Sequence, residues 1–321
     1  MNNSLAVVLI ASGVAYGTPL LFAALGELLA ERSGVLNLGV EGMMLVGAVM
    51  GFWTVQRVQA TSGLTLTVAI VIAALAGTAM ATIHAFLVIT LRANQIVSGL
   101  ALTIFAGAAG LSSYLGNNFN LADHPAEHSF GPLFPKALQD LPVVGPVVFA
   151  QNALVYISWA LVVAVGFYLG RTRPGLNLRA VGESPAAADT MGINITAYRY
   201  AHTLAGGALA GIGGATITLA ITPQWVNGIT GGSGWIAIAL VIFAFWRPDL
   251  CLVGAYFFGA LQALAPQLQA RNISLGPTVL WTGSLPYLMT VFVLVVVASG
   301  TARRRLGAPS ALGAAYVREE H

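Results

Sequence analysis

The chain has 321 residues, of which 57% are hydrophobic and 8% are charged, and its formal net charge is +3. A water-soluble surface carries roughly 25–35% charged residues, so this composition excludes a soluble protein. Most arginines stand one or two at a time between apolar runs rather than forming a basic patch, which argues against nucleic acid as a partner. The only cysteine, Cys251, excludes an intrachain disulfide and is expected to be a packing residue.

Apolar runs of more than 20 residues recur along the chain, and a helix crosses the bilayer core in about 20 apolar residues. We therefore predict an all-α fold, a polytopic transmembrane helical bundle of about eight to ten spans. Broken or re-entrant segments are expected among them. The expected spans lie near residues 5–27, 34–53, 64–90, 96–116, 148–170, 202–222, 232–246, 250–268 and 277–300.

Two of these spans are irregular in sequence. The span 34–53 contains Glu41 and several glycines, and 232–246 is short, so either is a candidate for a re-entrant or broken helix. We expect residues 1–302 to form one transmembrane domain and 303–321 a cytoplasmic tail. The polar stretch 171–200 is expected to be a cytoplasmic region that meets another protein.

The basic residues predict the orientation, because cytoplasmic loops carry an excess of arginine and lysine. With the N-terminus outside and the C-terminus cytoplasmic, only Arg57, Lys136 and Arg271 face outward. The basic residues that then face inward are Arg32, Arg92, Arg171, Arg173, Arg179, Arg199, Arg247, Arg303, Arg304, Arg305 and Arg318.

Small residues recur four apart in two adjacent rows, Gly206, Ala210 and Gly214 beside Gly207, Gly211 and Ala215. Such rows let the backbones of membrane helices approach closely.

No enzymatic motif is visible. The single lysine, Lys136, does not follow a glycine-rich loop, so the chain is not expected to hydrolyse ATP by itself. There is no HExxH or GxSxG motif, and we expect no catalytic residue, no metal site and no cofactor.

The stretch 31–44 places Glu41 among three glycines where an ordinary span would be apolar. A carboxylate at membrane depth is a candidate functional group, although Glu41 as a cap or paired acid within the bundle is an equal alternative. A second glycine-interrupted stretch, 223–235, lies in the other half of the chain. Such interrupted segments in corresponding places point to a substrate path in transporters.

Residues 184–192 predict a short helix, with Ser184 as N-cap, Pro185 at the first position and Gly192 after the end. A helix of two turns is marginal alone in water, so it needs a partner surface.

Four motifs give the chain a family resemblance: ERSGVLNLGVEGMMLVGA at 31–48, RANQIVSGLAL at 92–102, TRPGLNLRAVGESPAAADTMGIN at 172–194 and ALGAAYVREE at 311–320. In this order they resemble bacterial ATP-binding cassette (ABC) importer permeases for nucleosides and simple sugars, in the wider family of ribose and branched-chain amino acid permeases. The chain looks most like the shorter of the two permeases that nucleoside importers pair. Thr103 and the pair Ala244 and Phe245 depart from that pattern.

The resemblance implies a permease in the bacterial inner membrane that is not an enzyme. Its partners would be an ABC ATPase subunit, a second permease subunit, an extracytoplasmic substrate-binding protein and the lipid bilayer. It also implies a cytoplasmic coupling region within 171–200 that contacts the ATPase. The residues assigned to coupling are Gly182, Glu183, Ser184, Pro185, Ala187, Asp189 and Gly192.

A nucleoside is neutral and polar, so its path should offer hydrogen-bonding side chains. The residues assigned to the translocation path are Asn37, Glu41, Asn94, Gln95, Gln224 and Asn227, and Gln262 also fits. The alternative function is an ion-coupled secondary transporter, in which Glu41, His84 or His202 carries the coupling proton.

Overall fold

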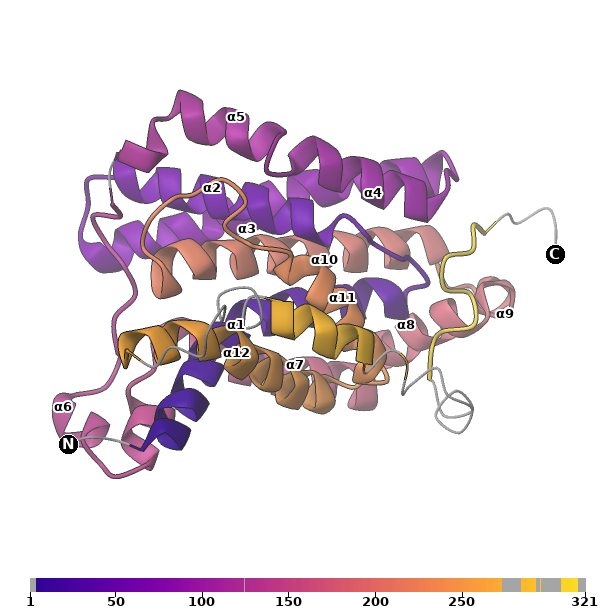
Figure 1. Ribbon diagram of the computed structural model, residues 1–321. Coiled ribbons are helices and arrows are strands. Elements are labelled where there is room, and N and C mark those ends of the chain that lie inside the picture. Colours follow the sequence, from indigo (N-terminus) through magenta and orange to yellow (C-terminus); the bar gives the residue numbers. More distant parts are fainter. Residues whose placement is uncertain (1–3, 124, 273–283, 293–294, 296–306, 317–321) are drawn as a thin grey trace.

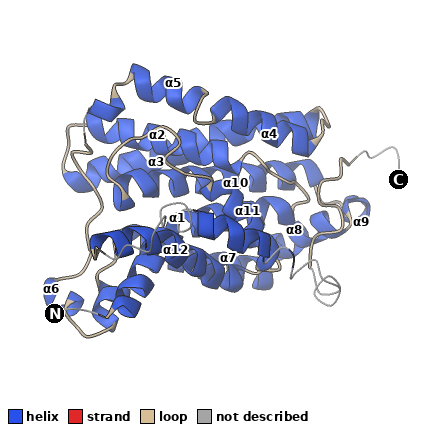
Figure 2. Ribbon diagram, viewed as in Figure 1, coloured by secondary structure: helices blue, strands red, loops and turns tan. Residues whose placement is uncertain are grey.

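The computed structural model describes residues 4–123, 125–272, 284–292, 295 and 307–316, and every regular element in this part of the chain is a helix (Figure 2). Six helices there are long and apolar enough to cross a membrane, which confirms the predicted all-α polytopic bundle. They are α1 (Leu5–Arg32), α3 with the π-helical turn that continues it (Ser62–Thr90), α4 with α5 (Gln95–Asn118), α7 (Ala153–Arg171), α10 with its π-helical turn (Ile195–Ile221) and α12 (Pro248–Ala270).

The irregular spans are short or interrupted, as expected. Helix α2 begins only at Val40 and runs to Arg57, and α11 has 11 residues, Ser233–Phe243. The segment 96–116, predicted as one span, is broken at residues 107–110 into α4 (Gln95–Ala106) and α5 (Leu111–Asn118). Most of the predicted span 277–300 lies outside the described residues, and its described part, 284–292, is helical.

The remaining elements lie at the two ends of the bundle (Figure 1). The short helix α6 (Lys136–Gln139) lies near the beginning of α1 at one end. At the other end lie α8 (Arg173–Glu183), α9 (Pro185–Thr190) and the segment 307–316, drawn in yellow.

Helix α10 is the centre of the bundle and packs against α1, α2 and α3. Its two rows of small residues make these contacts possible, as the sequence predicted. A Cβ atom added to Gly214 would lie 1.8 Å from the Met44 carbonyl oxygen of α2, and one added to Gly211 would lie 2.2 Å from the Ala73 carbonyl oxygen of α3. Lipid offers no hydrophobic force to join helices, so this close backbone packing is a main source of cohesion.

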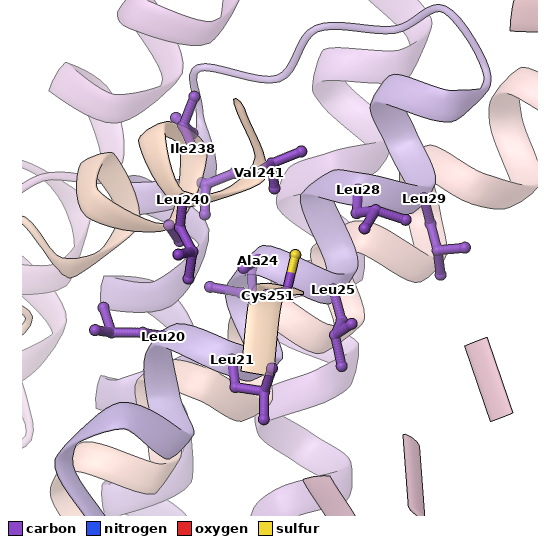
Figure 3. Packing of buried hydrophobic residues seen from close by; sticks show 14 of the residues in the cluster. Leu20, Leu21, Ala24, Leu25, Leu28, Leu29, Ile238, Leu240, Val241 and Cys251 are labelled. Carbon is purple, nitrogen blue, oxygen red and sulfur yellow. The ribbon is translucent and has the colours of Figure 1, made fainter. Parts of the chain in front are cut away.

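Cys251 is fully buried and packs among leucines of α1 and aliphatic residues of α11, which confirms its predicted packing role (Figure 3). The same apolar cluster joins α1, α11 and α12, so it fixes the position of the short helix α11.

Candidate functional site

The first break in the bundle is the irregular segment 34–39 between α1 and α2. Backbone groups that lack helical partners are tolerated at membrane depth only when protein groups satisfy them. Side chains of neighbouring helices do so here. Glu27 of α1 accepts from the Asn37 amide (3.0 Å), and Gln95 of α4 accepts from the Leu36 amide (2.7 Å).

Two more side chains hold the carbonyl groups of the same segment. A ring nitrogen of His84 lies 3.2 Å from the Leu36 carbonyl oxygen, and the Thr103 hydroxyl donates to the Leu38 carbonyl (2.9 Å). Asn37 is buried and accepts from the Gly39 amide at 3.0 Å. The break is therefore a fixed structure supported by α1, α3 and α4.

The second break is the loop 222–232 that precedes α11, and Glu41, in the first turn of α2, joins it to the first break. Its carboxylate accepts from the Thr230 hydroxyl (2.5 Å), the Gly232 amide (2.9 Å) and the Gly234 amide (2.7 Å). Gly232 has φ +81° and is the N-cap of α11. The carboxylate thus caps the N-terminus of α11, where the helix dipole favours negative charge. Of the two roles expected for Glu41, the structure shows the helix cap within the bundle.

A cavity of about 260 Å³ is lined in part by the loop that Glu41 binds and by the start of α11. Its polar lining comes from tyrosine, threonine, serine and glutamine side chains, and its described lining residues carry no charge. They are Tyr16, Pro19, Ile217, Ile221, Thr222, Ile229, Thr230, Gly231, Ser233, Ile236, Gln262, Ala265, Pro286 and Tyr287. Such a lining fits a neutral solute that offers both hydrogen bonds and an apolar face.

The predicted path residues have different surroundings. Asn37, Glu41 and Gln95 are buried at the two breaks. Asn94 is exposed and caps α4, accepting from the Ile96 and Val97 amides. Gln224 and Asn227 are exposed on the loop 222–232, and neither lines the cavity. Of the predicted polar residues, only Gln262 lines it.

The short helix predicted at 184–192 is confirmed as α9, and Gly192 follows it with φ +78°. Ser184 stands at the N-cap, but its hydroxyl makes no capping hydrogen bond. Ala187 is exposed and Ala188 is buried, so α9 has one free face and one packed face.

The other residues assigned to coupling surround α9. Gly182 is buried, and a Cβ atom there would lie 2.2 Å from the Arg32 carbonyl oxygen. The two acids face the end of the chain: Glu183 accepts from the Ser310 hydroxyl (2.8 Å) and Asp189 from the Tyr316 hydroxyl (3.0 Å).

Sequence reasoning missed several residues of the site. Glu27 is not among the predicted path residues, and Thr103 stands out in the sequence only as a departure from the family pattern, yet both bind the backbone of 34–39. Within the described residues, no group of three or more histidine, cysteine, aspartate or glutamate side chains could hold a metal ion.

Comparison with known proteins adds an independent finding. A model of the family "branched-chain amino acid transport system / permease component" matches residues 9–297. No solved structure matches the chain.

Three relatives match over nearly their whole length. TsgC13 of Haloferax volcanii, named provisionally as a glucose ABC transporter permease, is 42% identical over 98% of this chain and 99% of its own. The guanosine ABC transporter permease NupQ of Bacillus subtilis is 33% identical over 97% of both chains. The nucleoside ABC transporter permease NupC of Lactococcus lactis is 32% identical over 98% of both. More distant matches include a second permease for glucose in Haloferax volcanii, TsgB13, and one for guanosine in Bacillus subtilis, NupP.

Proposed function

Because the chain belongs to the family of branched-chain amino acid transport permease components, we propose that it forms the translocation path of an ATP-driven importer for a nucleoside or related small polar solute. The observation that carries this proposal is the match, over nearly the whole chain, to permeases of ABC transporters. The chain is a permease component, and we assign ATP hydrolysis to a separate ATPase subunit.

The cavity of about 260 Å³ supports the choice of substrate class. Its described lining has hydroxyl and amide groups for hydrogen bonds, the rings of Tyr16 and Tyr287, and no fixed charge. A charged solute would need a compensating charge in such a site, whereas a nucleoside or a sugar would not. The solutes for which these relatives are named, nucleosides, guanosine and glucose, are of this neutral class.

In the proposed importer, Asn37, Glu41 and Gln95 stabilise the two irregular segments beside the translocation path. Gln262 contacts the solute. Asn94, Gln224 and Asn227 remain proposed as path residues at exposed positions. The residues proposed for ATPase coupling are those of α9 and its flanks, with Ala187 on the free face.

The complex would contain an ABC ATPase subunit, a second permease, an extracytoplasmic binding protein and this chain in a bacterial inner membrane. The paired permeases of Haloferax volcanii and Bacillus subtilis favour a non-identical second permease. Residues 1–302 would be the transmembrane domain and 303–321 its cytoplasmic tail.

The orientation is a first test. We expect the N-terminus outside and α9 inside, because this arrangement places most arginines in the cytoplasm. The loop that contains residue 130 and the helix α9 lie at opposite ends of the bundle (Figure 1). Reporter fusions after residues 130 and 185 should score external and internal, and the reverse pattern would refute this topology.

Gln262 tests the proposed path. We expect Gln262→Leu to lower the maximal uptake rate about three- to tenfold, since one hydrogen bond between neutral groups contributes roughly 0.5–1.5 kcal/mol. Gln267→Leu on the same helix is the matched control, because Gln267 donates to Ser12 (2.9 Å) and does not line the cavity. Radiolabelled uptake in cells with equal amounts of each variant in the membrane is the measurement. Equal rates for Gln262→Leu and the control would remove Gln262 from the path.

A further inference from the structure

We propose that residues 307–316, called the strap below, support the docking surface for the ATPase subunit by holding α9 in position. This inference rests on the proposed function, because it assumes that α9 contacts the ATPase. The observation behind it is that the strap binds both acids that flank or lie in α9, together with the ends of α1 and α8 and the start of α10.

Backbone hydrogen bonds fix the strap to the bundle. The Ala311 amide donates to the Gly182 carbonyl of α8 (3.0 Å), and the Gly313 amide donates to the Gly34 carbonyl just after α1 (3.2 Å). The Arg32 side chain donates to the Gly307 carbonyl at 3.2 Å. The strap is therefore tied to transmembrane helix α1 on one side and to α8 on the other.

Two side-chain hydrogen bonds then connect the strap to α9. Ser310 donates to Glu183, the last residue of α8 and two before α9, while Tyr316 donates to Asp189, near the end of α9. Both acceptors are carboxylates, and hydrogen bonds to charged groups are the stronger kind. The acids that sequence analysis assigned to the ATPase thus bind this chain's own strap.

Packing supports the same arrangement. The Tyr316 side chain packs against a small apolar cluster of Val181, Ala188 and Ile195, one residue from each of α8, α9 and α10. Arg199 of α10 is 3% exposed, and its guanidinium donates to the Ala314 carbonyl (3.2 Å). The strap thereby covers a buried cation and the inner face of α9.

A two-turn helix gains little stability from its own hydrogen bonds, so its position depends on its surroundings. The strap supplies the surface that the inner face of α9 needs. It leaves the face with Ala187 exposed, and this is the face offered to the ATPase. A displaced strap would move that face relative to α1 and α10, and so weaken the mechanical link to the membrane helices.

The test compares Tyr316→Phe, Asp189→Ala and the double variant, since alanine removes both acceptor oxygens of Asp189. The importer complex is purified through a tag at the N-terminus, and the affinity of the detergent-solubilised permease for its ATPase subunit is measured by titration. Tyr200→Phe is the matched control, because Tyr200 is also half-buried and shares a 2.5 Å hydrogen bond with Thr90, which belongs neither to α9 nor to the strap. Membrane insertion and the melting temperature of each permease are measured in parallel.

Each single variant should weaken ATPase binding roughly tenfold, the effect of losing one hydrogen bond to a charged group. The double variant should bind no worse than either single one, since the two residues act through each other. Insertion and melting temperature should match those of Tyr200→Phe.

Unchanged ATPase affinity in both single variants, or effects that simply add, would overturn the inference. A lowered melting temperature with unchanged affinity would do the same, because the strap would then stabilise only the fold. Ala187→Arg separates this failure from failure of the proposed function. If Ala187→Arg loses the ATPase while the Tyr316 and Asp189 variants keep it, the strap inference alone is wrong. If Ala187→Arg also binds normally, the role of α9 is wrong.

Discussion

Ala187→Arg is expected to abolish both ATPase assembly and solute uptake, while the permease still inserts in the membrane. Ala187 lies on the exposed face of α9, so an arginine side chain fits without disturbing the packed face around Ala188. The same side chain would hold a partner surface several ångströms away from the α9 backbone, and a charge without a partner in a buried interface costs several kcal/mol. The measurement is the amount of ATPase subunit that copurifies with the variant.

Ala137→Arg is the matched control for this change. Ala137 is also an exposed alanine on a short helix, α6, but it lies at the opposite end of the bundle (Figure 1). It should insert, retain the ATPase and transport normally. If Ala187→Arg behaves like Ala137→Arg, then α9 is not the coupling helix.

Glu41→Ala should reduce uptake more than tenfold, because three hydrogen-bond donors then lose their acceptor at the start of α11. A buried donor left unpaired costs roughly 1–3 kcal/mol, and the Thr230 hydroxyl and the Gly232 and Gly234 amides are all affected. Glu41→Gln keeps one acceptor oxygen, so it should weaken uptake only partly. Thr230→Val removes a single donor and should have the mildest effect.

The same position distinguishes the two classes of transporter. In an ATP-driven importer, Glu41→Gln leaves the dependence of uptake on external pH unchanged, because the residue carries no coupling proton. In an ion-coupled transporter, the change would eliminate concentrative uptake and spare exchange. Uptake measured against external pH separates these results, with Asp140→Asn as a control at an exposed acid in the loop between α6 and α7.

The local features of this fold could be predicted from short stretches of sequence. The proline and the glycine at either end predicted a helix between Ser184 and Gly192, where α9 lies. The small residues four apart on α10 predicted its close packing. The glycines around Glu41 predicted a break in the span 34–53. These features follow from residues within one or two turns of each other.

The contacts that build the site could not be predicted in this way. Glu41 binds residues of the loop and of α11 that lie 189–193 positions away, and Asp189 binds Tyr316, 127 positions away. Many other carboxylates and hydroxyls in the sequence would be equally suitable hydrogen-bond partners. Only the packing of the helices determines which of them meet. Asn94 is a different case. An asparagine directly before a helix is a common N-cap, so its capping role could have been recognised from the sequence.

The most direct test of ATP-driven transport is solute accumulation in proteoliposomes that contain the complete importer complex. Radiolabelled guanosine and glucose serve as probes, with the binding protein on one face of the membrane and ATP supplied to the ATPase face. Accumulation above equilibrium for one of these probes should require ATP, occur without an ion gradient and be lost with the Ala187→Arg chain. Accumulation driven by a proton gradient without ATP, and retained in Ala187→Arg, would contradict the account.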